Sequence, residues 1–77
     1  MPTVIKLIDL TLFGCPVHYI KARDHLRDMA VEEALLLEVN NGDAIDEVLN
    51  SLRKDGHLCE IVAKQTSTSI IQVTKRL

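Results

Sequence analysis

The hydrophobic pattern of the chain switches repeatedly between strand and helix spacing, which restricts the folds open to it. Thr3 to Leu10 is a run of β-branched and aliphatic residues with one lysine, typical of a mostly buried strand. From Pro16 to about Met29, apolar residues recur at helical spacing. Glu32 to Asn40 is again short and aliphatic, and the polar Asn-Asn-Gly-Asp segment that begins at its last residue favours a strand over a helix.

The second half of the chain continues this alternation. A stripe of apolar residues predicts a helix that begins at Asp43 and stops at Gly56. His57 to Lys64 alternates as a strand does, with Cys59, Ile61 and Ala63 on one face. A polar turn, 65–69, separates it from a last strand, 70–75.

The resulting order, βαβαββ, predicts an α+β fold in the form of a two-layer α/β sandwich. Each helix has a single apolar stripe, so both can cover one face of a four-stranded mixed sheet. The first βαβ unit should join parallel strands by a right-handed crossover, and the last two strands should form an antiparallel hairpin. We expect one domain over residues 1–77, because a chain this short builds only one core.

Composition excludes several classes of function. The net charge is −2, and no basic stripe or aromatic platform suggests direct binding of nucleic acid. Residues 1–4 lack the features of a signal peptide, and no apolar run is long enough for a membrane span, so we expect a cytoplasmic protein. A chain this small has little room for a substrate cavity of ~300 Å³, which favours a protein that presents one reactive atom to other proteins.

The segment that most strongly suggests a reactive group is Gly14-Cys15-Pro16, at the junction of the first predicted strand and the first predicted helix. Proline is well tolerated in the first turn of a helix, because its missing N–H would have no intrahelical partner there. Cys15 therefore falls at or beside the N-cap, where free N–H groups and the helix dipole favour negative charge. A thiol in this position is biased toward the nucleophilic thiolate.

Several of these features together resemble the TusA/SirA-like family of small sulfur-carrier proteins. They are Asp9-Leu10, Cys15-Pro16 opening a helix, the 35–39 strand (Leu-Leu-Leu-Glu-Val) and Gly56-His57, and the resemblance runs from about Ile5 to Lys75. It implies the same βαβαββ fold. It also implies that Cys15 accepts sulfane sulfur as a persulfide and passes it to a partner protein. The implied partners are a cysteine desulfurase or rhodanese-type donor and a sulfur-accepting protein, with no cofactor.

The chain departs from the family signature at three places. The signature Cys-Pro-x-Pro reads Cys-Pro-Val-His here, Leu12 stands where a glycine is usual, and Asn41-Gly42 replaces a common Asp-Pro. Because His18 has the N–H that a proline lacks, its amide could reach the Cys15 sulfur, and its imidazole lies on roughly the same helix face. One hypothesis is therefore that His18 assists the thiolate; the interpretation that we favour over it is a solvated histidine of the first turn.

For other candidate residues, too, a purely structural role is an alternative to a functional one. Cys59 shares a strand face with apolar residues and is expected to be a buried structural cysteine rather than a resolving thiol. Together with His57 and the Cys15/His18 pair it could be imagined as a zinc site, but the spacing is unusual and no metal is expected.

A cationic set on the first helix, Lys21, Arg23 and Arg27, could dock an acidic partner near the thiol, or simply form a solvated face. The leading hypothesis is thus a sulfurtransferase-like persulfide carrier. The alternative is a non-catalytic regulatory or adaptor domain of the same fold. The pathway, whether transfer-RNA thiolation, cofactor synthesis or sulfur oxidation, is not indicated by any residue.

Overall fold

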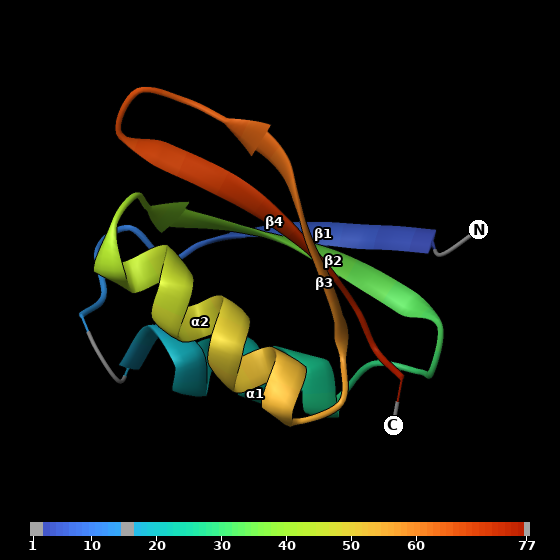
Figure 1. Ribbon diagram of the computed structural model, residues 1–77. Helices are drawn as coiled ribbons and strands as arrows, with labels where there is room; N and C mark the ends of the chain where they lie inside the picture. Colours follow the sequence, from blue (N-terminus) through green and yellow to red (C-terminus); the bar gives the residue numbers. More distant parts are fainter. Residues whose placement is uncertain (1–2, 15–16, 77) are drawn as a thin grey trace.

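The six predicted elements form in the predicted order. The computed structural model describes residues 3–14 and 17–76 (Figure 1). The elements are β1 (Thr3–Asp9), α1 (Val17–Arg27), β2 (Glu33–Asn40), α2 (Asp43–Lys54), β3 (Leu58–Lys64) and β4 (Thr68–Thr74). None of the helices in this part of the chain is long and apolar enough to cross a membrane.

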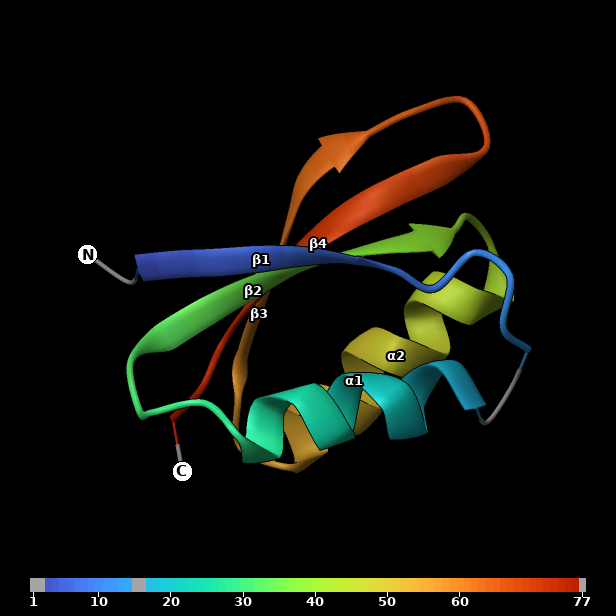
Figure 2. The ribbon, with the colours of Figure 1, turned by 180° about the vertical axis from the view of Figure 1, so that it is seen from behind.

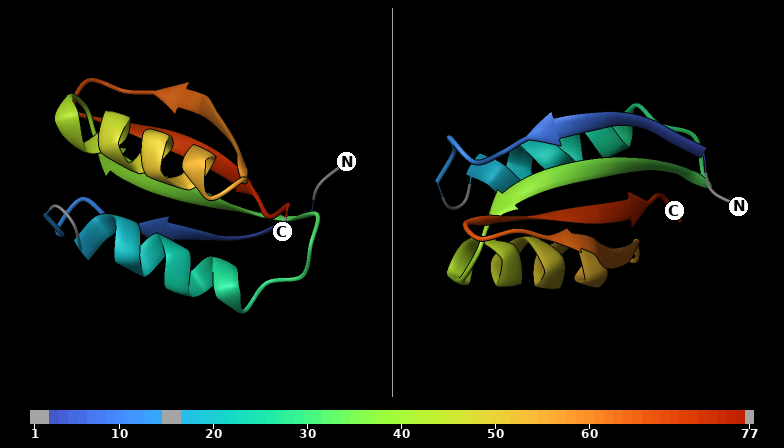
Figure 3. Two further views of the ribbon diagram at one scale, coloured as in Figure 1. Left: turned by 60° about the horizontal axis from the view of Figure 1, so that its bottom comes forward. Right: turned by 90° about the horizontal axis from the view of Figure 1, so that it is seen from above.

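The strands form one mixed sheet in the order β1-β2-β4-β3. β1 pairs with β2 in parallel, whereas β4 pairs antiparallel with both β2 and β3. Parallel neighbours require a crossover connection, which α1 supplies, and α2 carries the chain from β2 past β4 to the far edge. Both helices cover the same face of the sheet, so the predicted two-layer sandwich is confirmed (Figures 1 and 3).

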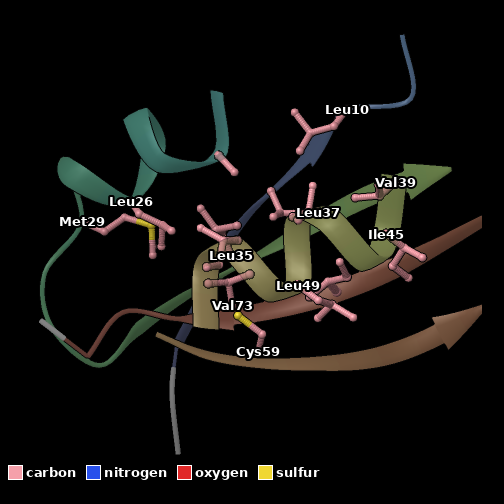
Figure 4. Close-up of a cluster of buried hydrophobic side chains, with 14 residues drawn as sticks. Leu10, Leu26, Met29, Leu35, Leu37, Val39, Ile45, Leu49, Cys59 and Val73 are labelled. Atoms are coloured by element: carbon pink, nitrogen blue, oxygen red, sulfur yellow. The ribbon is translucent and has the colours of Figure 1, made fainter. Parts of the chain in front are cut away.

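The core lies between the helices and this face of the central strands. Residues facing it in β2 are Leu35, Leu37 and Val39, all at most 1% exposed. Directly paired residues of β4 continue the surface, and apolar side chains of both helices close it (Figure 4). The second aliphatic run is therefore a strand, as predicted, although leucine favours helices: its alternate side chains pack under both helices.

β4 begins earlier than predicted, at Thr68 rather than Ile70. The preceding turn is tight, because the amide of Gln65 donates to the carbonyl of Thr68 at 2.8 Å. Ser69 is buried, and its hydroxyl donates to the side-chain oxygen of Asn41. This partner satisfies a polar group on the core face of β4. The polar composition of residues 65–69 had predicted a turn there, so the early start of the strand was missed.

The predicted alternation of β3 is wrong beyond its first residues. Cys59 is buried, but Ile61 and Val62 are 44% and 48% exposed. The pairing with β4 is irregular between Ile61 and Ala63, and the β3–β4 hairpin extends away from both helices (Figure 1). A strand at the edge of the sheet loses its cover once it passes the end of the helical layer, so its apolar residues stay exposed.

Candidate functional site

The loop that leads from β1 to the candidate thiol is anchored on both sides. Cys15 and Pro16 lie outside the described residues. Before them, the amide of Leu10 donates to the carbonyl of Glu38 at 2.9 Å, and the amide of Phe13 donates to the carbonyl of Leu10 at 3.2 Å. Asn40 donates through its side chain to the carbonyl of Thr11 at 2.8 Å, which ties the loop to the end of β2 (Figure 2).

A side-chain turn precedes this anchor at the end of β1. The carboxylate of Asp9 accepts bonds from both the amide and the hydroxyl of Thr11. These bonds favour the ionised form, so they hold the pKa of Asp9 below its ordinary value. The chain therefore enters the loop in a fixed direction.

His18 is buried, with 1% of its surface exposed, so the expectation of a solvated histidine is wrong. Its backbone amide donates to the carbonyl of Gly14 at 3.1 Å instead of being free for a neighbouring sulfur. Gly14 and Val17 flank residues 15 and 16, and this bond ties the two sides together across them. The first turn of α1 thus uses the amide that a proline at position 18 would lack.

The two ring nitrogens of His18 face different groups. Nδ1 accepts the backbone N–H of Tyr19 at 2.8 Å, which assigns the proton of the neutral ring to Nε2. Nε2 faces the carboxylate of Glu47 on α2 at 3.6 Å, too far for a hydrogen bond, and has no hydrogen-bond partner among the described residues. Both nitrogens are therefore directed at groups of the two-helix layer.

Exposed apolar residues flank the candidate thiol on both sides, and sequence reasoning missed them. Leu12 is 89% exposed, and the other members of this apolar rim are Phe13, Val17 and Ile20, each at least 37% exposed. Val17 and Ile20 are three positions apart in α1 and so share a face of the helix. The available signal was four large apolar residues within nine positions of one cysteine, outside the helical stripe that the core uses.

The three cationic residues of α1 separate into two groups. The ammonium of Lys21 lies 4.8 Å from the centre of the Phe13 ring, so this residue belongs with the apolar rim. Arg23 stacks over Tyr19 at 5.5 Å, and Arg27 pairs with Asp24 at 3.2 Å. Arg23 and Arg27 line a cavity nearer the C-terminal end of the helix, away from the loop that precedes α1.

Cys59 is a buried structural cysteine, as predicted. It is 4% exposed, and its thiol points toward the carbonyl of His57 at 3.8 Å. Burial raises the pKa of Cys59 to about 11, a shift that the nearby Arg53 only partly offsets. The thiol is therefore protonated at neutral pH and unreactive.

Between residues 3 and 14 and between 17 and 76, no group of three or more His, Cys, Asp or Glu side chains could hold a metal ion. His57 is half-buried at the start of β3, where its Nδ1 accepts the amide of Arg76 at 3.4 Å. Its pKa is lowered mainly by burial, with a further contribution from Lys75, while Asp55 opposes the shift. A neutral ring in this place fits a corner residue between α2 and β3.

The comparisons with known proteins support the fold. No family model matches the sequence, and no curated protein matches it. The structure is similar to the crystal structure of a SirA-like protein from Desulfitobacterium hafniense, with a TM-score of 0.80 over 95% of this chain and 100% of that one. The fold is SirA-like. Because the sequences are only 16% identical, the likeness extends to the architecture and leaves the chemistry of the site to be argued from its residues.

Proposed function

We propose that this protein is a small sulfur carrier that accepts sulfane sulfur as a persulfide on Cys15 and passes it to a partner. One observation carries the proposal: in a SirA-like fold, the Cys-Pro pair directly precedes α1, and the chain's other cysteine is buried and protonated. A cysteine before a helix start is favoured as thiolate by the helix dipole and the free N–H groups.

In the proposed reaction the Cys15 thiolate attacks the outer sulfur of a donor persulfide, R–S–SH. A new S–S bond forms to Cys15 while the S–S bond of the donor breaks, which releases the donor thiolate R–S⁻. An acceptor thiolate then attacks the outer sulfur of Cys15–S–SH and restores the Cys15 thiolate. No net oxidation or reduction accompanies the transfer, so the protein needs no cofactor.

Partner proteins would dock over the apolar rim beside Cys15. Its large exposed side chains, together with the ammonium of Lys21, suit a partner surface that is apolar at its centre and acidic at its edge. By resemblance, the donor is a cysteine desulfurase or rhodanese-type protein, and the acceptor is a further sulfur-accepting protein. Arg23 and Arg27 lie farther along α1 and would contribute at most to the margin of this contact.

His18 acts on Cys15 through the backbone in this proposal, as a positioning residue. Its amide holds Gly14, and its ring accepts the N–H of Tyr19, so both of its contacts fix the first turn of α1. Because these contacts occupy the N–H groups of His18 and Tyr19, it is the dipole of an ordered α1 that favours the thiolate in this proposal.

The proposal is tested by intact-mass measurement after incubation with a persulfide-forming cysteine desulfurase and free cysteine. We expect a gain of one sulfur atom on the wild type and on Cys59→Ala, and none on Cys15→Ser. The Cys59→Ala variant is the matched control, because it also removes one cysteine. Sulfur on Cys15→Ser, or none on the wild type, would refute the carrier.

The apolar rim also favours a second candidate, a non-catalytic adaptor domain. Such a domain would use the same exposed side chains to bind a partner, without any chemistry at Cys15. In that case the wild type would gain no sulfur. Leu12→Ser would still abolish the binding of a partner, whereas Cys15→Ser would leave it unchanged.

A further inference from the structure

A cavity of about 330 Å³ lies on the helical side of the molecule, although a chain this small was expected to have little room for one. Its walls come from α1, from the corner between α2 and β3, and from the residue after β4: Arg23, Asp24, Leu26, Arg27, His57 and Lys75. The C-terminal ends of α1, α2 and β4 all lie toward the same end of the molecule (Figure 3). The volume is at the lower end of the range for ligand sites, so only a small ligand fits.

Positive charge is concentrated around this cavity, although the whole chain carries −2. Three of the six lining residues are permanently cationic at neutral pH, and the single carboxylate, Asp24, is already paired with Arg27 at 3.2 Å. The nearby Asp55 accepts the hydroxyl of Tyr19 at 2.5 Å. Arg23 has no ion-pair partner in the part of the chain that the structure describes. Its guanidinium stacks over the ring of Tyr19 at 5.5 Å, so no carboxylate offsets its charge and it can still attract an anion.

A further source of negative potential near the cavity, the C-terminal end of α1, is offset by a lysine. A helix C-terminus carries partial negative charge on its last carbonyls, which would repel an anion. Here the ammonium of Lys75 donates to the carbonyl of Met29 at 2.7 Å and to that of Arg27 at 3.3 Å. These bonds offset the partial negative charge at the C-terminal end of α1 and hold the ammonium of Lys75 at the cavity wall.

His57 adds a neutral donor. Because its Nδ1 accepts the amide of Arg76, the neutral ring carries its proton on Nε2. Burial and the neighbouring Lys75 lower the pKa of His57, so the ring stays neutral near pH 7. The cavity therefore combines two guanidinium groups, an ammonium and one N–H donor with the apolar side chain of Leu26.

We propose that this cavity binds a small, doubly charged oxyanion of the phosphate type, either free phosphate or the phosphate group of a small ester. Arg23 and Arg27 are its charged donors, and His57 is its neutral donor. Guanidinium groups suit this ligand because their planar N–H pairs match two oxyanion oxygens. This proposal does not rest on sulfur transfer, because none of the lining residues is Cys15 or a neighbour of it in the sequence.

The experiment is an amide NMR titration with sodium phosphate, and in parallel with sodium chloride at the same ionic strength. We expect saturable shifts in the millimolar range at residues 23–27, 57 and 75, with phosphate only. Arg23→Gln should weaken binding about tenfold, the loss of one charge-assisted bond. Lys64→Gln, which removes the same charge from an exposed site on the distant hairpin, should change affinity less than about twofold.

Titration with glycerol 3-phosphate separates the two sources of the ligand. Tighter binding than that of inorganic phosphate assigns the site to an ester, and equal binding assigns it to the free ion. Shifts that chloride reproduces, no saturation with either phosphate, or equal weakening by Arg23→Gln and Lys64→Gln would each overturn the proposal. Arg23 is exposed, so its variant should fold, and Arg27→Gln provides a second test at the same cavity.

Discussion

Removing the imidazole of His18 is expected to destabilise the protein strongly, because the buried ring orders the first turn of α1. His18→Ala deletes a ring that is 1% exposed and takes away the acceptor of the Tyr19 N–H. The lost hydrogen bond costs about 1 kcal/mol, and the lost packing costs about 1–2 kcal/mol more. The free energy of unfolding should therefore fall by about 2–3 kcal/mol, which lowers Tm by roughly 8–24 °C in a domain of this size.

His18→Asn is the matched variant, because its side-chain oxygen can still accept the Tyr19 N–H but cannot act as a base. We expect it to recover about 1 kcal/mol relative to His18→Ala in urea denaturation. The pH dependence of Cys15 alkylation, measured in a Cys59→Ala background, should have the same midpoint with and without the His18→Asn substitution. That midpoint should lie below the ordinary thiol pKa of about 8.5.

The opposite combination would refute the reasoning. If His18→Asn raises the alkylation midpoint to about 8.5 while the free energy of unfolding stays unchanged, the ring acts on the thiol directly. A loss of stability below about 0.5 kcal/mol in His18→Ala would show that the buried contacts contribute little. Either result would remove the positional role proposed for this residue.

Two further predictions concern the other titrating groups. With its pKa raised to about 11, Cys59 should be roughly 0.1% thiolate near pH 8. An alkylating reagent should therefore label one cysteine in the native protein and both in urea, as counted by mass spectrometry. Double labelling of the native protein would contradict the burial of Cys59. His57 has a lowered pKa in the folded state, so the unfolded chain binds the proton first and stability should fall as pH drops below about 6.5. His57→Asn removes this contribution, and its curve of unfolding free energy against pH should be flatter than that of the wild type over that range; parallel curves would argue against the shift.

The order of elements could be predicted because it depends on local periodicity. The stripe of α2 and the aliphatic run of β2 each bury one face, and neither needs knowledge of its neighbours. The predicted alternation of β3 was wrong for the opposite reason, because whether Ile61 is covered depends on where the helical layer ends. Alternation in the sequence predicts on which face of the strand a side chain lies, but tertiary packing determines whether that face is covered.

The candidate site shows the same division between local and long-range information. The position of Cys15 before a helix start follows from Pro16 and the helical spacing after it, both of which are local. The burial of His18 could not be predicted, because it depends on Glu47 and the packing of α2 against α1. The cavity is also long-range, since residues from α1, the α2–β3 corner and the end of β4 meet there.

The burial of His18 bears on how its departure from the Cys-Pro-x-Pro pattern should be interpreted. A histidine exposed beside the thiol would add a titrating base to the site and alter its chemistry near neutral pH. Here the ring lies under α2 with its nitrogens directed at Tyr19 and Glu47, so the exposed surface next to residues 15 and 16 gains no base from it. What the substitution adds is an amide bonded to Gly14 and a contact between the two helices. Both strengthen the first turn of α1, and an ordered first turn is what the proposed thiolate at Cys15 requires.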